Sequence, residues 1–268
     1  MNHDTYLTTS WDDGHPLDLR VADLLAKYDL RGTFYVPRTA EHGTMSQAQV
    51  RELSSAFEIG AHTLHHVDLT GVTEQKAWQE IVDSKSWVED STGAPCPMFC
   101  PPKGRYSNRH LELIRNAGYI GVRSVELLSL ACPRPKRGLM MLPTTVQAQP
   151  HGLRAYATNV IKRGAFRNLW LYIAHGRSTD WVKLSRSLLC QALERGGVFH
   201  LWGHSWELQQ TGQWQRLEEV LRFMSQFTSQ ARGLTNLQVC QARGMSRNKG
   251  ERQDKNPVPL RPCREFSR

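Results

Sequence analysis

Acidic and imidazole side chains concentrate in three short segments of this chain. Residues 10–14 read Ser-Trp-Asp-Asp-Gly, residues 62–66 read His-Thr-Leu-His-His, and residues 200–205 read His-Leu-Trp-Gly-His-Ser. Each segment ends or directly follows a short apolar run of the kind that forms a β-strand. Because sites in α/β barrels and open α/β sheets assemble at the carboxyl ends of the strands, we expect the three segments to face one another.

Two of these segments hold residues that suit a divalent cation. Asp12 and Asp13 are adjacent carboxylates that repel each other unless positive charge lies nearby, although an Asp-Gly step alone is more often a polar turn. His62 and His66 are four residues apart, which on a helical turn would place both imidazoles on one face. Two imidazoles and one carboxylate would leave open positions for water and substrate, as a hydrolytic metal site needs.

The second carboxylate and His204 supply the remaining groups for hydrolysis. A neighbouring carboxylate can take a proton from a metal-activated water as that water attacks a carbonyl carbon. His204 could then donate a proton to the leaving nitrogen. One histidine taken alone is more often a packing or capping residue, so this hypothesis depends on the three segments together. The combination predicts an amide or ester hydrolase.

Strand-like runs alternate with amphipathic helical runs along the chain. The sequence predicts strands at residues 6–10, 33–36, 58–61, 98–100, 119–124, 139–142, 169–174, 198–202 and 234–240. It predicts helices at residues 17–28, 46–57, 74–90, 109–117, 153–163, 181–195 and 214–227. Ser46 and Gln49 form a capping-box pattern, and Gly118 is the expected glycine after a helix. Repeated strand-helix units predict a parallel sheet, either closed as a barrel or left open.

Composition indicates a soluble globular chain with a basic end. Of the 268 residues, 40% are hydrophobic and 22% are charged, which favours neither a disordered nor a membrane protein. The formal net charge is +9, and residues 243–268 contribute eight basic and three acidic side chains. We therefore expect a single domain at residues 1–241 and a disordered tail at 242–268, with no specific nucleic-acid partner. The charge would also suit an anionic substrate or a membrane surface.

The cysteines and the N-terminal residues allow a prediction of the cellular compartment. The six cysteines show no paired C-x-x-C spacing, so a zinc ribbon is not expected. The first residues show no basic stretch followed by a long apolar run, and no segment approaches the roughly 20 apolar residues that span a bilayer. We expect a cytoplasmic protein whose cysteines are mostly free thiols. The oligomeric state is left open.

The three segments resemble motifs of the polysaccharide deacetylase domain, which nodulation-type chitooligosaccharide deacetylases, peptidoglycan deacetylases and carbohydrate esterase family four share. The resemblance spans roughly residues 5–240. The family motif Thr-Phe-Asp-Asp-Gly is similar to residues 10–14, which implies Asp12 as catalytic base and Asp13 as metal ligand. The motif His-Ser/Thr-x-x-His matches residues 62–66 and implies His62 and His66 as the other ligands. His65 is then a neighbour of the metal site.

A third motif is only partly kept. The family has Arg-x-Pro-x-Gly where this chain has Cys100-Pro-Pro-Lys103-Gly, which keeps the backbone N–H at Lys103 for the oxyanion but loses the arginine that orients the base. We predict that Arg123, at the end of the next strand run, replaces that arginine. Arg177 is a weaker candidate, because residues 177–181 resemble the fourth motif, Asp-x-x-Asp-Trp, with its first Asp replaced.

A fifth motif, Leu-x-x-His, is similar to residues 201–204 and implies His204 as general acid, with Glu207 as a candidate partner for its imidazole. Trp11, Trp202 and Trp206 could stack on a sugar ring, although packing in the core is the commoner role of such side chains.

The resemblance implies a fold, a metal and a reaction. The fold is a distorted (β/α) barrel in a single domain. The metal is commonly zinc, with cobalt or nickel in some members. The ligand set would also suit manganese. The reaction is removal of an N-acyl group from an amino sugar or glycan intermediate, with acetyl as the leading candidate for that group. Two alternatives stay open: hydrolysis of another C–N bond, in a cyclic imide, ureide, formamido compound or small amide, and a metal-retaining glycan-binding module without catalysis.

Overall fold

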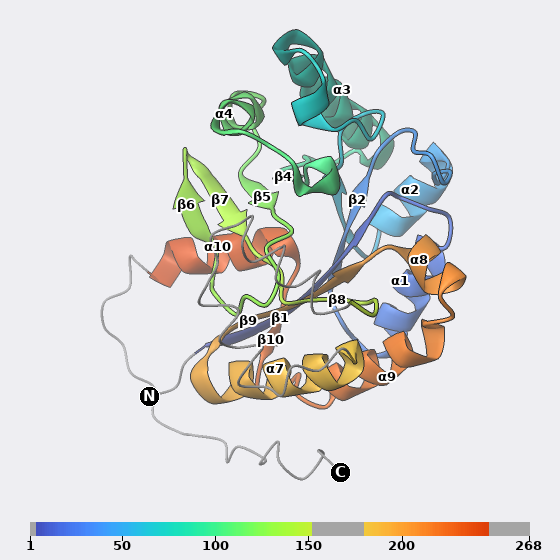
Figure 1. Ribbon diagram of the computed structural model, residues 1–268, viewed down its shortest axis with the longest axis vertical. Helices are drawn as coiled ribbons and strands as arrows, with labels where there is room; N and C mark the ends of the chain where they lie inside the picture. Colours follow the sequence, from blue (N-terminus) through green and yellow to red (C-terminus); the bar gives the residue numbers. More distant parts are fainter. Residues whose placement is uncertain (1–3, 152–179, 247–268) are drawn as a thin grey trace.

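One sheet organises the molecule. The computed structural model describes residues 4–151 and 180–246. Its sheet runs in the order β6-β7-β5-β4-β3-β2-β1-β9-β8, with β10 beside β1 (Figure 1). The strands are β1 Thr5–Asp12, β2 Gly32–Val36, β3 Glu58–Ala61, β4 Met98–Phe99, β5 Gly121–Arg123, β6 Arg134–Lys136, β7 Leu139–Leu142, β8 Val146–Gln147, β9 Gly197–Gly203 and β10 Arg232–Gly233.

The strand directions bring the functional segments to one edge of the sheet. Every pairing between the described strands is parallel except that between β6 and β7. Within the described residues no pairing joins β8 to β6, so the sheet is an open half-barrel. The expected distorted (β/α) barrel is confirmed in this open form.

Helices cover the outside of the half-barrel and form the main core with it (Figure 1). Ser46 and Gln49 make the predicted capping box at the start of α2. Among the described residues no helix is both long enough and apolar enough to cross a membrane. The helices are α1 Asp18–Lys27, α2 Gln47–Ser54, α3 Glu74–Thr92, α4 Asn108–Asn116, α7 Trp181–Arg195, α8 Ser205–Gln210, α9 Trp214–Ser225 and α10 Asn236–Ser246, with short 3-10 turns at Leu69–Gly71 and Pro102–Gly104.

The prediction of a strand at residues 234–240 is wrong, because α10 begins there. Side chains of the sheet satisfy the first amides of this helix: Thr33 accepts from the Asn236 N–H, and the Glu58 carboxylate accepts from the Leu237 N–H. α10 packs against β1, β5 and β7 and closes a smaller core that includes Tyr35 and Val239. These tertiary contacts outweigh a local pattern that fits either element.

Other differences concern short elements and the end of the domain. β6 and β8 were not predicted, and α10 continues to Ser246, past the predicted boundary after residue 241. The helix expected at 153–163, the strand expected at 169–174 and the tail at 247–268 lie outside the described residues. Cys96, Cys100 and Cys240 are free thiols, as expected.

Glu58 makes the stability of the fold depend on pH. Burial raises the pKa of this carboxyl to about 7 from its usual 4.5, against hydrogen bonds involving Thr235, Leu237 and Thr33 that lower it. The unfolded chain therefore loses this proton at lower pH than the folded chain. The stability that Glu58 contributes is present below pH 4.5 and is lost as pH rises through 7.

Since Glu58 is partly exposed, we expect the loss to be about 2 kcal/mol. Urea unfolding of the wild type and Glu58→Gln at a series of pH values measures it, and the variant should lack this component. An identical pH dependence in both proteins would contradict the prediction.

Candidate active site

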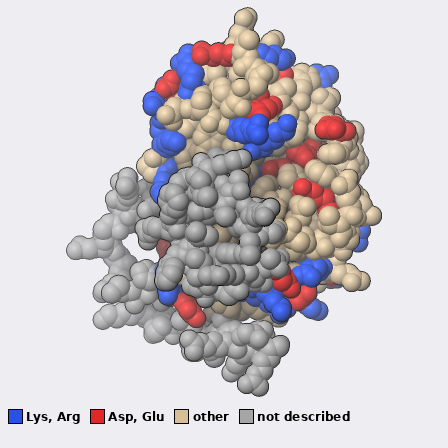
Figure 2. All heavy atoms as spheres, in the orientation of Figure 1, with Lys and Arg blue, Asp and Glu red and all other residues tan. Residues whose placement is uncertain are grey.

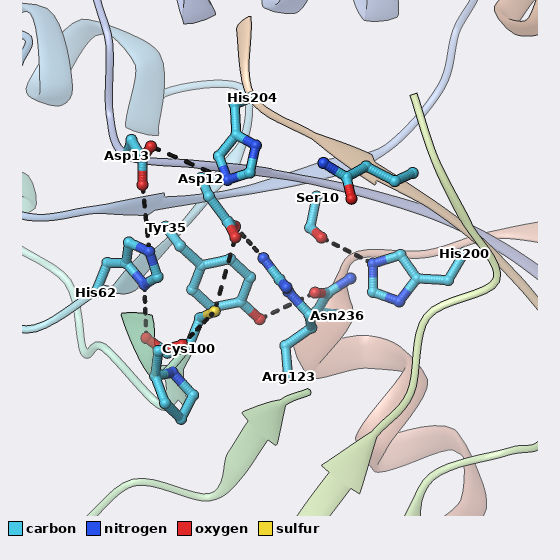
Figure 3. Close-up of polar contacts among 12 residues, drawn as sticks. Ser10, Asp12, Asp13, Tyr35, His62, Cys100, Arg123, His200, His204 and Asn236 are labelled. Carbon is cyan, nitrogen blue, oxygen red and sulfur yellow. Dashed lines mark hydrogen bonds and ion pairs between the residues drawn. The ribbon is translucent and has the colours of Figure 1, made fainter. Parts of the chain in front are cut away.

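The carboxyl ends of four strands converge on one pocket. β1 ends at Asp12 and leads into Asp13, and His62 and His204 directly follow β3 and β9 (Figure 3). Arg123 is the last residue of β5. The turn after β1 requires glycine, because Gly14 has a φ of +60° and a Cβ there would lie 2.5 Å from Val36 Cγ1. The three segments therefore meet, as the sequence predicted.

Asp13, His62 and His66 form a set that fits a divalent metal. Asp13 Oδ1 lies 3.4 Å from His62 Nε2 and 3.1 Å from His66 Nε2. Three such ligand atoms within 4.8 Å of one another could hold one ion, and metal–ligand bonds of 2.0–2.1 Å place tetrahedral ligands about 3.3 Å apart. Asp13 Oδ1 is buried and has no hydrogen-bond partner among the described residues. A buried acceptor without a partner, facing two imidazole nitrogens, is what a metal would satisfy.

The backbone that carries these ligands differs from the expected helical turn. Residues 62–66 form no helix, and Thr63 and His66 have left-handed φ values of 57° and 52°. Asp13 and Lys103 share this conformation, so four of the seven non-glycine residues with positive φ in the described part of the chain lie at the site. Such conformations cost free energy and cluster where function requires them. The two imidazoles therefore converge through a strained loop.

A backbone contact orients His62 for metal binding. His62 Nδ1 lies 2.6 Å from the Cys100 carbonyl oxygen, to which it donates when Nε2 is the free nitrogen. Metal-binding histidines characteristically donate their second nitrogen in this way. His65 points elsewhere, since its Nδ1 lies 2.8 Å from Glu80 Oε1. It is therefore a neighbour of the site, in agreement with the resemblance.

Asp12 is held by Arg123, the residue named from the sequence as the substitute for the lost arginine. Arg123 Nη2 donates to Asp12 Oδ1, and the guanidinium is fully buried. It lies 5.3 Å from the ring centre of Tyr35 and 4.7 Å from that of Trp202, in cation–π contact. The Cys100 thiol lies 3.9 Å from Asp12 Oδ2, and burial raises the pKa of Cys100 well above its usual value. Arg177 lies outside the described residues.

His204 pairs with Glu207, three residues along the chain. His204 Nδ1 lies 2.7 Å from Glu207 Oε2, and Gln147 donates to the same oxygen over 3.0 Å. Burial lowers the pKa of His204, but the hydrogen bond to Glu207 and the charges of Asp13 and Glu207 raise it more, to about 9. Nε2 lies 4.0 Å from Asp13 Oδ2. The hydrogen bond to Glu207 therefore favours a protonated imidazole beside the ligand cluster.

His200, the other histidine of the third segment, lies outside this pocket. Its Nε2 contacts the Ser10 hydroxyl at 2.9 Å and its Nδ1 contacts the Pro143 carbonyl at 3.0 Å. Burial lowers the pKa of His200 to about 3. A neutral, fully satisfied imidazole of this kind has a structural role.

The pocket has a volume of about 440 Å³, and Asp12, Asp13, His62, His66 and His204 all line it. Lys103 lies on its wall, within the 3-10 turn Pro102–Gly104, with φ of 57°. Among the described residues no hydrogen-bond acceptor is found for its backbone N–H. That N–H is a suitable donor to a substrate oxygen. The side chains that line the pocket are those of Asp12, Asp13, Ala40, Glu41, His42, His62, His66, Lys103, Val125, Leu127, Gln147, His151, Trp202, His204 and Trp206.

The pocket residues His42 and Gln147 were not predicted from the sequence, nor was the bond from Trp206 to the metal-ligand set. Trp206 Nε1 donates to Asp13 Oδ2 over 2.8 Å, and its ring lies 4.0 Å from that of His42. His42 follows β2, so its place after a strand could have identified it. Gln147 ends β8, a strand too short to predict. Of the three tryptophans considered for sugar stacking, Trp11 is completely buried in the core, whereas Trp202 and Trp206 line the pocket.

Comparison with known proteins finds a family match in the N-terminal part of the chain. Residues 2–122 match the family model described as polysaccharide deacetylase. Over 121 residues the chain is 27% identical to the peptidoglycan-N-acetylglucosamine deacetylase of Bacillus cereus, covering 44% of this chain and 55% of that protein. The curated relatives are matched over 38% to 55% of their own length. The chain therefore spans about half of their length or less.

Solved structures extend the likeness beyond residue 122. A crystal structure from Mycobacterium smegmatis assigned to the polysaccharide deacetylases has a TM-score of 0.65 at 13% identity, covering 97% of this chain and 96% of that one. A carbohydrate esterase family four pseudoenzyme from Bacillus anthracis has a TM-score of 0.53 at 12% identity, covering 90% and 66%. At such identities the likeness shows the fold alone. Residues 2–122 thus match the polysaccharide deacetylase family model, and solved structures assigned to that family share the fold of most of the chain.

Proposed function

We propose that this chain is a metal-dependent hydrolase that removes an N-acyl group from an amino sugar or glycan intermediate. Acetyl is the leading candidate for that group. One observation carries the proposal. In a single pocket, the metal-ligand set of Asp13, His62 and His66 lies beside a carboxylate held by Arg123 and an imidazole held by Glu207. A hydrolytic site needs these three parts together.

The residues divide the work as follows. Asp13, His62 and His66 would hold a divalent metal, most often zinc in such sites, whose positive charge would polarise the acyl carbonyl and acidify water. Asp12 accepts the proton of the attacking water, and Arg123 fixes the direction of its lone pairs. The Lys103 N–H donates to the carbonyl oxygen as it gains negative charge.

His204 completes the reaction as the general acid. Its imidazolium donates the Nε2 proton to the leaving nitrogen, while Nδ1 stays bonded to Glu207. The hydrogen bond to Glu207 raises the pKa of His204 and so favours the protonated imidazole. Glu207 thus stands in for the aspartate that is absent from the fourth motif at position 177. The carboxylate comes from α8 rather than from the segment of that motif.

Catalysis is favoured over a purely binding role. The family fold alone does not decide the matter, because a pseudoenzyme shares it. A module that only retains a metal needs neither an oriented base nor an oriented acid. Burying the Arg123 guanidinium against Asp12 costs desolvation free energy. An oriented catalytic base explains why the pair is buried, whereas a binding module does not need it.

The proposed substrate is a carbohydrate, with no specific nucleic-acid partner. Lys and Arg side chains are intermingled with Asp and Glu over the described part of the face in Figure 2. The exposed Lys103 side chain at the pocket wall is the group that would attract an anionic substrate.

Acetate and formate release from a panel of substrates tests the proposal. The panel contains N-acetylated and N-formylated amino sugars, chitin oligomers and one cyclic imide. We expect acetate release by the metal-loaded wild type, and a kcat about 10- to 100-fold lower in Glu207→Gln, because His204 loses its anionic partner.

Glu218→Gln, which changes an exposed ion pair with Lys27, is the matched control and should keep the wild-type rate. Release that Glu207→Gln leaves unchanged would rule out His204 and Glu207 as the acid and its partner. Bound metal without release from any compound would favour the binding module.

A further inference from the structure

The two oxygens of the Asp13 carboxylate face different groups. Its Oδ1 faces the two histidine nitrogens, whereas its Oδ2 accepts the Nε1–H of Trp206 over 2.8 Å. Only 7% of the Asp13 side chain is exposed, so water cannot readily replace the tryptophan as donor. We propose that Trp206 is a positioning residue that restricts Asp13 to a single ligating oxygen and thereby sets the affinity and preference of the metal site.

A charge-assisted hydrogen bond gives Trp206 this influence. An N–H that donates to one carboxylate oxygen fixes the plane of the carboxylate and withdraws that oxygen from the metal. An Asp13 without this bond can rotate and offer both oxygens. One-oxygen ligation keeps the number of protein ligands at three, which suits zinc in a catalytic site. Two-oxygen ligation raises that number and favours metals that accept more ligands.

Two contacts hold Trp206 in place. Its ring lies 4.0 Å from the His42 ring, which belongs to the loop after β2. Its backbone belongs to α8, which begins directly after His204 and also carries Glu207. The short helix α8 therefore links the metal ligand Asp13 to the proposed acid. A displacement of Trp206 would disturb both sides of the pocket.

Metal titration of Trp206→Phe tests the inference, which rests on the proposed metal site. Phenylalanine keeps an aromatic ring at this position, although a smaller one, and removes the N–H donor. We expect the Kd for Zn²⁺ to rise about 10-fold, with a smaller change for Mn²⁺. The visible absorption of the Co²⁺-loaded protein should become weaker, since cobalt absorbs less as its coordination number rises.

His65→Ala is the matched control, because it removes an imidazole that contacts Glu80 outside the ligand set and leaves the Nε1–H of Trp206 in place. We expect its Zn²⁺ affinity to stay within about twofold of the wild type, with an unchanged Co²⁺ spectrum. Equal weakening in both variants would assign the effect to a general disturbance of the site and overturn the inference, as would unchanged values in Trp206→Phe. A wild type that binds metal but releases no acyl group contradicts the proposed reaction and leaves the inference standing. A wild type that binds no metal overturns both.

Discussion

Replacing Arg123 with alanine is expected to lower kcat by about 10²- to 10³-fold and to destabilise the fold by about 3 to 5 kcal/mol. The catalytic loss follows because Asp12 loses the donor that orients its carboxylate. The stability loss follows because Asp12, only 4% exposed, would remain as a buried charge without its partner. Steady-state kinetics and urea unfolding measure the two effects.

Two further variants separate orientation from folding. Arg123→Lys keeps the charge but cannot present a planar guanidinium, so we expect most of the stability to return while kcat stays about 10-fold low. Cys100→Ala removes the thiol near Asp12 Oδ2 and leaves the Arg123 pair intact, so kcat should fall less than about threefold. Wild-type kcat in a folded Arg123→Ala would remove Arg123 from the proposed mechanism.

Strand ends were the most informative part of the sequence. A parallel sheet brings every carboxyl end to one edge, so residues as distant as Asp12, Arg123 and His204 could be placed together without knowing the strand order. The same logic led to Arg123 once position 100 proved to be cysteine. The predicted helix at residues 181–195 agrees with α7, because its apolar positions follow one face of a helix.

Long-range contacts were what the sequence could not supply. The first amides of α10 bond to Thr33 and Glu58, which are about 200 residues away, so no local pattern shows this helix start. The loop at residues 62–66 has left-handed residues, which leave no periodic pattern of apolar side chains. Likewise the contact of Trp206 with Asp13 joins α8 to the turn after β1.

Metal content and acyl release, measured on the same purified samples, address the central claim most directly. We expect about one equivalent of divalent metal in the wild type. Asp13→Ala and His62→Ala each remove one of three ligands, so metal should disappear and the rate should fall by at least about 10³-fold. His65→Ala is the matched control, because His65 contacts Glu80 and lies outside the ligand set.

The account predicts stoichiometric metal and acyl release in the wild type and in His65→Ala, and the loss of both in Asp13→Ala and His62→Ala. A wild type that binds no metal after purification without chelators and reconstitution, or an Asp13→Ala protein that keeps both metal and activity, would contradict it.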